Sequence, residues 1–400
     1  MCLAVFTAEE FKDRLNRTKQ KMSEEGVEVL LVTNPSNMYY LSGYNAWSFY
    51  VHQMLIVMID EPQPIWLGRQ MDANSAKVTT WLDHDNIIPY PDDYVQSEIK
   101  HPMQFTANIL KEIGQAKRVI GLEMETHFFS AQSYMKFTEA LPNAAFKDAS
   151  KLVNWVRIIK SDREIEYMRR AAQIVEQAMQ RGYDTIDVGV RECDAAAEIY
   201  HAQVSGTPQF GGDYPSIVPM MPSGEQTSSP HLTWTDKRYK PNDPVIIEIA
   251  GCYKRYHAPL ARTMVLGAPS QHLLDASQAV QEALHQTLAS IKPGMTAEEI
   301  EYKWSVFIKK RGYYKSSRLG YSIGASYPPD WGEHTVSIRP GDKTVIKPNM
   351  TFHLIPGFWF DDWGVEISES IRITENGCER LANFPQDLYV KTNPPRYNIL

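Results

Sequence analysis

Apolar residues in the first 155 positions gather in short runs that alternate with polar, helix-compatible stretches. A predicted helix at residues 8–25 leads into the first of four predicted strands, which lie at residues 27–33, 53–59, 87–90 and 119–123. Strands that alternate with helices are typical of an α/β unit. Residues 1–155 are therefore predicted to form one domain, with a boundary near Trp155.

From residue 161 onward the apolar positions follow a helical period. Ser161-Asp162-Arg163-Glu164 has the form of a capping box, and apolar residues then repeat at steps of three and four as far as Met179. Gly182 is predicted to end this helix as its C-cap. A second helix is predicted at about residues 190–204, which gives a pair of helices.

The same pattern returns later in the chain. Residues 276–284 echo residues 171–179, and Thr296-Ala297-Glu298-Glu299 caps a further helix. Two helix pairs, each followed by apolar strands, predict an internal pseudo-repeat with a curved sheet that helices cover on one face. We therefore expect a second domain at residues 156–391 and a tail at residues 392–400.

The composition excludes several classes of protein. The net charge is −7, and Lys and Arg are scattered along the chain, which argues against a nucleic-acid partner. No apolar run is long enough to cross a membrane, so no membrane partner is expected. The four cysteines have neither CxxC spacing nor the density of a disulfide framework, which indicates a reducing, cytoplasmic location.

Five segments in the second half of the chain form an ordered set: residues 242–248, 256–263, 320–324, 349–357 and 364–369. In this order they resemble the signature segments of the creatinase/aminopeptidase P family. The resemblance implies an α/β (α+β) chain, with a smaller N-terminal α/β domain of the creatinase type and a C-terminal pita-bread domain. It also implies the site of a dimetal hydrolase, since peptidases of that family bind two divalent ions with Asp, Asp, His, Glu and Glu.

The ligand positions implied by this resemblance hold unexpected residues. The first Asp position is Glu248, and the other four positions hold Pro259, Tyr321, Ile355 and Ser368. Hard divalent cations need several oxygen or nitrogen donors in one shell, and the side chains of proline and isoleucine offer none. We therefore expect a hydrolase that uses neither a metal ion nor another cofactor.

Two residues are predicted to carry the chemistry. The resemblance places His231, in a loop ahead of the Glu248 strand, at the position of the family's proton-shuttling histidine, which metal-free creatinase keeps as its acid/base. A histidine can exchange protons near neutral pH. Glu248, with no metal to bind, is predicted to reach the substrate as a nucleophile, which we favour, or as the base for a water molecule.

Substrate-binding residues follow from strand alternation. Side chains two positions apart in a strand share a face, so His257, His353 and Glu366 are predicted to face the site beside former ligand positions. In the related peptidases the position of Glu366 is often an arginine that binds the substrate carboxylate. A carboxylate there, in a site without cations, predicts an acidic pocket and a substrate with a positive charge near the bond that is cut.

An aromatic cage for a delocalised cation is a further prediction. Its candidates come from both domains: Trp47, Phe49, Tyr50, Tyr321, Trp331, Trp359 and Trp363. Tyr321 is the best placed of them, because it fills a former ligand position. For the others, a place in the hydrophobic core explains the residue equally well.

A closer resemblance covers residues 37–38, 47–53, 211–215, 230–234, 248–253, 326–333 and 362–364. These segments are similar to those of a branch of the family that opens the ring of a small cyclic amidine. The resemblance implies a small zwitterionic substrate that bears a carboxylate and yields an N-acetylated 2,4-diaminobutyrate. It also implies a homodimer, in which the loop at residues 44–50 walls the partner's site, and association with a deacetylase that acts on the product.

Other functions stay open from the sequence. A metallopeptidase could use a rebuilt site of Glu248, His257, His353 and Glu366, which are the right types of donor. A related C–N hydrolase could act on another amidine or guanidine compound, and a pita-bread protein could bind a ligand without catalysis. The retention of His231 argues against a pure binding protein, since binding needs no proton shuttle.

Overall fold

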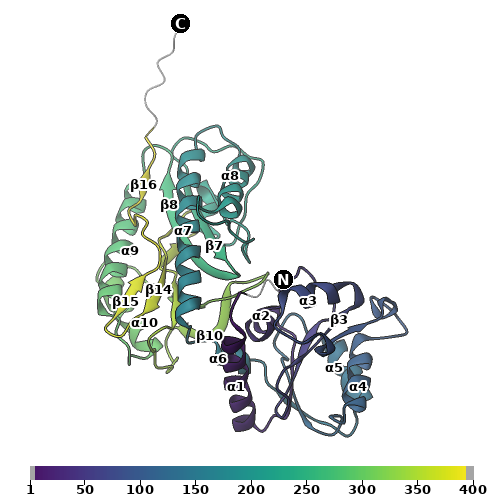
Figure 1. The fold of residues 1–400 in the computed structure, drawn as a ribbon. Coiled ribbons are helices and arrows are strands. Elements are labelled where there is room, and N and C mark those ends of the chain that lie inside the picture. The colour runs from purple at the N-terminus through teal and green to yellow at the C-terminus, as the bar shows by residue number, and fades with distance from the viewer. Residues whose placement is uncertain (1–4, 393–400) are drawn as a thin grey trace. The chain divides into compact units, whose positions relative to one another are not determined.

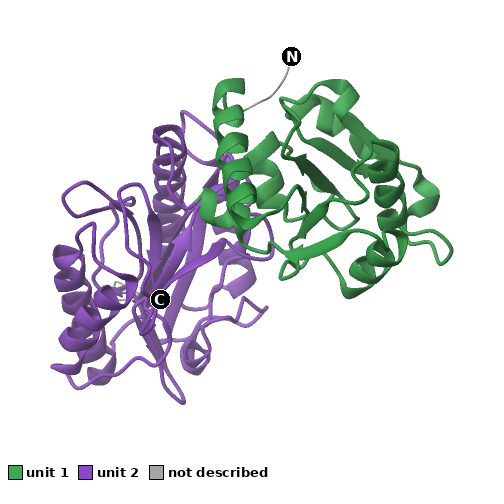
Figure 2. Cartoon of the chain, turned by 90° about the horizontal axis from the view of Figure 1, so that it is seen from below, with its two compact units in different colours: residues 1–157 green, residues 158–400 purple. Residues whose placement is uncertain are grey.

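The computed structural model describes residues 5–392 and divides into two compact units, residues 1–157 and residues 158–400 (Figure 2). The sequence places this boundary near Trp155. Of the predicted tail, only Thr392 belongs to the described part, and residues 393–400 lie outside it. Within residues 5–392, no helix is both long and apolar enough to cross a lipid bilayer.

Unit 1 is built on a six-stranded sheet with the order β4-β3-β2-β1-β5-β6. Its strands are β1 (Val29–Val32), β2 (Met54–Met58), β3 (Ile65–Arg69), β4 (Ile87–Tyr90), β5 (Val119–Leu122) and β6 (Ala145–Asp148). The four predicted strands are confirmed as β1, β2, β4 and β5. The predicted strands do not include β3 or β6. β2 and β3 form an antiparallel pair, because residues 59–64 between them are too few for a crossover helix.

The helices of unit 1 cover both faces of this sheet. They are α1 (Ala8–Glu25), α2 (Pro35–Ser42), α3 (Ala73–Thr79), α4 (Pro102–Glu112), α5 (Ala131–Ala140) and α6 (Leu152–Val156), and α1 has the predicted bounds. In β1, Leu30 and Val32 pack in a cluster with α1, α2, α3 and α6, whereas Val29 and Leu31 pack in a cluster with α4 and α5. A strand buried on both faces reads as a continuous apolar run in the sequence.

Unit 2 contains two helix pairs, α7 (Asp162–Thr185) with α8 (Glu192–Ser205) and α9 (Gln271–Ser290) with α10 (Ala297–Lys309). The capping boxes predicted at Ser161 and Thr296 are both present. The prediction that Gly182 caps α7 is wrong, because the helix continues to Thr185. A Cβ atom on Gly182 would stand 3.2 Å from both Ile199 and Ile247. The glycine therefore allows these two side chains, from the second helix of the pair and from a later strand, to pack closely against α7.

Strands follow each helix pair in unit 2, as the predicted pseudo-repeat requires. After α8 come the long antiparallel strands β7 (Pro244–Tyr253) and β8 (Tyr256–Val265), and α7 lies against both (Figure 1). After α10 comes a sheet with the order β10-β9-β11-β14-β15. The remaining bounds are β9 (Gly320–Ile323), β10 (Gly332–Ile338), β11 (Thr351–Leu354), β12 (Gly357–Trp359), β13 (Gly364–Glu366), β14 (Glu369–Ile373), β15 (Cys378–Arg380) and β16 (Tyr389–Val390).

Buried polar contacts join β8 to the start of β14. The Ala261 N–H donates to Ser368 Oγ at 2.6 Å, and the Ser368 N–H donates to Ala261 O at 3.0 Å. Arg262 and Glu369, whose side chains have no exposed surface, form an ion pair of 2.7 Å beside them. Since Ala261 is the register partner of Glu248 in β7, these contacts fix Ser368 close to the strand that carries Glu248.

Candidate functional site

A cavity of about 400 Å³ in unit 2 brings together residues from distant parts of the sequence. It is lined by Ile217, Met220, Pro230, His231, Glu248, Ser317, Arg318, Tyr321, Asp330, Trp331, Ile355, Trp359 and Glu366. Six of the predicted site residues are among them: His231, Glu248, Tyr321, Trp331, Trp359 and Glu366. The volume is typical of sites that bind small molecules.

Backbone hydrogen bonds hold the His231 loop beside Glu248. Met220 and Glu248 exchange two such bonds, of 3.0 and 2.9 Å, and the Met221 N–H donates to Leu232 O at 3.0 Å. The loop therefore starts and returns next to β7. It brings the exposed His231 to the same cavity as Glu248, which is only 6% exposed.

Two buried carboxylates set the electrostatics of the cavity. Burial, and then the neighbouring Glu366, raises the pKa of Glu248 well above its ordinary value. Burial also raises the pKa of Glu366 to about 7, although Lys315 opposes this shift. One Glu366 oxygen, Oε2, is buried without a hydrogen-bond partner in the described part of the chain. Glu366 therefore lacks a hydrogen-bond donor for this oxygen.

Lys315 and Arg318 correct the prediction of a purely acidic pocket. Lys315 donates to Ser317 Oγ at 2.6 Å and lies 4.7 Å from the centroid of the Trp359 ring, and burial lowers its pKa to about 8. Arg318 lines the cavity, with its guanidinium 4.3 Å from the centroid of the Tyr321 ring. Strand alternation could not find either residue, because both lie in the loop before β9. No hydrophobic period or motif in the sequence points to them.

A chain of hydrogen bonds lies behind the cavity wall. Tyr321 in β9 and His353 in β11 are register partners, with Tyr321 Oη 3.0 Å from His353 Nδ1. His353 Nε2 is 2.7 Å from Ser368 Oγ, and Trp331 Nε1–H donates to Tyr321 Oη at 2.7 Å. Burial lowers the pKa of His353 to about 3, so its ring is neutral and one of its nitrogens must accept a hydrogen bond.

The direction of this chain follows from Ser368. Its Oγ accepts the Ala261 N–H, and among residues 5–392 the one acceptor within reach of its own hydrogen is His353 Nε2. The Ser368 hydroxyl therefore donates to Nε2, and the His353 Nδ1–H donates to Tyr321 Oη. The Tyr321 hydroxyl hydrogen then has no acceptor among the described residues, and because Tyr321 lines the cavity this hydroxyl can donate to a ligand.

His353 itself does not line the cavity. It has no exposed surface and lies behind Tyr321, so the prediction that it binds substrate directly is corrected. It can act on a ligand only through the Tyr321 hydroxyl.

His257 is also absent from the cavity wall. Its register partner is Cys252, four residues along β7 from Glu248, which corresponds to about 13 Å along the strand. Its Nε2 accepts the Ser216 N–H and its Nδ1 donates to Arg255 O, both at 2.9 Å. Strand alternation predicts the face of the sheet on which His257 lies, but not its distance from Glu248 along the hairpin. His257 binds backbone groups far from the cavity and is a structural residue here.

The tryptophans of unit 2 divide between the cavity and the core. Trp331, which has no exposed surface, and Trp359 line the cavity. Trp363 instead stacks on Phe360, with ring centroids 4.4 Å apart, and packs against the core with α9. Two of the three candidates can therefore form an aromatic wall.

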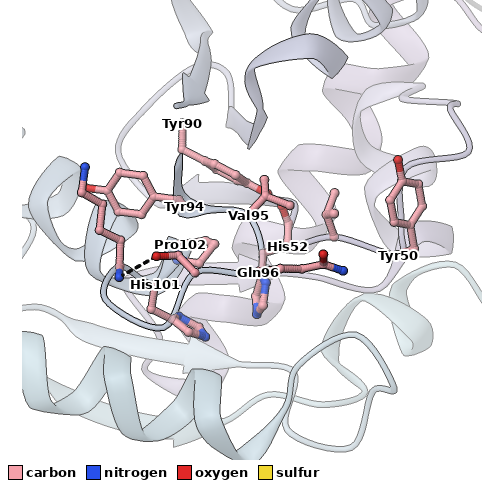
Figure 3. A pocket seen from close by; sticks show the side chains of 11 residues that line it. Tyr50, His52, Tyr90, Tyr94, Val95, Gln96, His101 and Pro102 are labelled. Atoms are coloured by element: carbon pink, nitrogen blue, oxygen red, sulfur yellow. Dashed lines mark hydrogen bonds between the residues drawn. The ribbon is translucent and has the colours of Figure 1, made fainter. Parts of the chain in front are cut away.

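The three aromatic candidates of unit 1 lie in a different setting. Trp47 and Tyr50 are 58% and 65% exposed, and Phe49 packs on Trp47 with ring centroids 4.8 Å apart. Tyr50 lines a separate cavity of about 210 Å³ within unit 1, beside His52 and Tyr90 (Figure 3). A contribution of these residues to substrate binding stays a prediction.

The former ligand positions do not fit a pair of metal ions. Pro259 and Ile355 have no donor atom in their side chains, and the hydroxyls of Tyr321 and Ser368 belong to the hydrogen-bond chain. Glu248 is the one carboxylate left among the five positions. In the described part of the chain, no group of three or more His, Cys, Asp and Glu side chains is placed to hold a metal ion.

Comparison with known proteins identifies the family. Residues 166–375 match metallopeptidase family M24, and residues 14–159 match the creatinase/prolidase N-terminal domain. The chain belongs to metallopeptidase family M24. The predicted fold class, with a creatinase-type α/β domain followed by a pita-bread domain, is thereby confirmed, and membership of this hydrolytic family makes the chain a hydrolase.

Among M24 relatives, an ectoine hydrolase from Halomonas elongata is 47% identical over 393 residues, which cover 96% of this chain and 98% of that protein. A Xaa-Pro dipeptidase from Pyrococcus furiosus is 26% identical, over 94% of this chain and 99% of that protein. The crystal structure of a prolidase from Thermococcus sibiricus matches with a TM-score of 0.83 at 22% identity, over 96% of this chain and 100% of that one. This last likeness shows the shared fold.

Replacing Glu366 by Gln is expected to raise the free energy of unfolding of the ligand-free protein, relative to the wild type, by more at pH 8.5 than at pH 6. The pKa of Glu366 is raised from 4.5 to about 7 in the folded state, so folding favours its protonated form. The stability that this form contributes is fully present below pH 4.5 and is lost as the pH rises through about 7. E366Q removes that loss, and near pH 8.5 Lys315 can give up its proton, since its pKa is about 8.

The measurement is the free energy of unfolding in urea at both pH values, with the exposed Glu375→Gln variant as the matched control. A difference in stability between E366Q and the wild type that is the same at pH 6 and pH 8.5 would contradict the raised pKa of Glu366.

Proposed function

We propose that this chain hydrolyses the cyclic amidine ring of ectoine, or of hydroxyectoine, to N-acetyl-2,4-diaminobutyrate without a metal ion. The observation that carries the proposal is the pair of buried carboxylates, Glu248 and Glu366, in a cavity walled by Tyr321 and Trp331. An amidinium is a planar, delocalised cation, which suits carboxylates beside aromatic rings. The 47% identity to an ectoine hydrolase over nearly the whole chain supports this substrate.

In the proposed reaction the amidinium carbon lies against Glu248. The carboxylate either adds to that carbon itself or removes a proton from a water molecule that adds to it, and each route gives a tetrahedral adduct. His231 then gives a proton to one ring nitrogen as the C–N bond breaks. The former amidine carbon becomes the acetyl carbonyl carbon, and water supplies its oxygen in both routes. If Glu248 is the nucleophile, water adds to the same carbon in a second step, and the bond between that carbon and the Glu248 oxygen breaks to free the carboxylate.

Tyr321 and Glu366 assist this reaction in different ways. The Tyr321 hydroxyl hydrogen, which the His353 contact leaves without an acceptor in the described part of the chain, donates to the oxygen of the adduct. Glu366 supplies a negative charge that pairs with the amidinium. Because burial raises the pKa of Glu366 to about 7, bound substrate stabilises its ionised form.

A rebuilt metal site has less support. It needs His257 and His353 as ligands, and both have their ring nitrogens engaged inside the protein, away from the cavity. A binding protein without catalysis gives no reason for His231 to share a cavity with Glu248. A homodimer, association with a deacetylase and a cytoplasmic location stay predictions for the proposed enzyme.

Replacing Glu248 by Gln or His231 by Gln is expected to lower kcat for ectoine by about 10²-fold or more, because each removes a group that bonds with or exchanges protons with the reacting atoms. The measurement is steady-state turnover of ectoine and hydroxyectoine by variants whose folding is checked by circular dichroism. Glu375→Gln and His201→Gln, both at exposed positions, serve as controls and should keep wild-type turnover.

Wild-type turnover by a folded E248Q would remove Glu248 from the mechanism. Rapid quench followed by mass spectrometry separates the two routes. A mass increase on the Glu248 peptide supports the nucleophile, and unlabelled peptide at every time point supports the activated water.

Metal removal is expected to leave turnover of ectoine unchanged, because Pro259, Ile355 and the engaged Tyr321 and Ser368 hydroxyls offer no metal shell. The measurement is elemental analysis of the purified protein together with activity before and after dialysis against a chelator, with a metal-dependent peptidase treated in parallel. Activity that is lost in chelator and returns with one equivalent of zinc, manganese or iron would contradict the proposal.

A further inference from the structure

The charged groups of the cavity are divided by depth. Glu248 and Glu366 are 6% and 2% exposed, whereas Arg318 is exposed and lines the same cavity. Asp330, whose side chain is 36% exposed, also lines the cavity and interacts with the charge of Arg318. The open part of the site therefore holds a cation as well as a carboxylate, whereas the buried part holds the two carboxylates. A zwitterion whose cationic end enters first would match this arrangement.

Arg318 is held in place by an aromatic ring and a hydroxyl group. Its guanidinium lies over the Tyr321 ring, 4.3 Å from the centroid, and its Nη1 donates to Ser337 Oγ at 3.3 Å. Within residues 5–392 no carboxylate lies within ion-pair distance of it. Its charge acts on Asp330 across the same cavity, and Asp330 pairs with His334 at 2.8 Å. A guanidinium stacked on an aromatic face keeps donors free at its edge, and that edge matches a carboxylate with two parallel hydrogen bonds.

Lys315, the other cation near the carboxylates, uses its contacts within the protein. It is 9% exposed and does not line the cavity, it donates to Ser317 Oγ, and its charge interacts with Glu366 and Glu248. Of these two cations, Arg318 is the one that faces a ligand.

We infer that Arg318 binds the carboxylate of the substrate and thereby turns the amidinium carbon of the ring toward Glu248. The inference rests on the proposed function, since it assigns a role within that same site. It makes Arg318 a specificity residue, which selects cyclic amidines that bear a carboxylate over the same ring without one.

The test compares wild type, Arg318→Gln and Arg318→Lys on two substrates. One is ectoine, and the other is 2-methyl-1,4,5,6-tetrahydropyrimidine, the same cyclic amidine without the carboxylate. Loss of a charged, paired hydrogen bond is expected to lower kcat/KM for ectoine by about 10- to 100-fold in R318Q, with partial recovery in R318K. The loss on the carboxylate-free ring should be at least about 5-fold smaller. Arg339→Gln, at another exposed position, is the control and should match wild type on both rings.

The outcomes separate the inference from the proposed function. Turnover of ectoine by the wild type decides the proposed function by itself. An equal loss on both rings, or wild-type kcat/KM for ectoine in R318Q, would overturn the inference while leaving the proposed function intact. If the wild type turns over neither ring, calorimetric binding of ectoine still decides. Weaker binding to R318Q by a similar factor supports the inference, and equal binding or none overturns it.

Discussion

Two buried carboxylates that line one cavity need a proton or a positive charge near them. Repulsion between charges is stronger in such a site than in water, and burial adds the cost of losing solvent. Both effects raise the pKa of Glu248, and burial raises that of Glu366 to about 7 despite Lys315 nearby. The free protein therefore holds protons in this pair near neutral pH. An amidinium that enters the cavity can replace those protons. The two carboxylates are unfavourable when both are ionised without a cation, and they therefore favour a cationic ligand over a neutral one.

The residues at the former ligand positions form a neutral network around this charged pair. Ser368, His353 and Tyr321 satisfy one another's hydrogen bonds, and the fixed direction of the chain leaves one phenolic hydrogen for the ligand. A metal centre would need ionised or lone-pair donors at the same places. The same Tyr321 ring also supports Arg318, so one side chain connects the donor toward the adduct with the proposed carboxylate site.

Local patterns predict those parts of the fold that depend on near neighbours in the sequence. The capping box at Ser161 is confirmed because a cap involves only four residues, whereas Gly182 is misread because its role depends on packing against another strand and helix. In the site, motif order brings the cavity residues together, but alternation does not show that His257 lies too far along the hairpin or that His353 stands behind another side chain. Arg318 lies in a loop that has no hydrophobic periodicity, so no sequence pattern predicts the position of its side chain.

The central claim is that a cation replaces protons on the Glu248 and Glu366 pair, and counting protons on binding tests it most directly. The ligand is acetamidinium, an unreactive amidinium, titrated into the wild-type protein at pH 6.5 by calorimetry in two buffers that differ in ionisation enthalpy. Because Glu366 has a pKa of about 7 and that of Glu248 is also raised, we expect binding to release a large fraction of a proton or more. Binding with no proton release, or no binding of the amidinium at all, would contradict the claim.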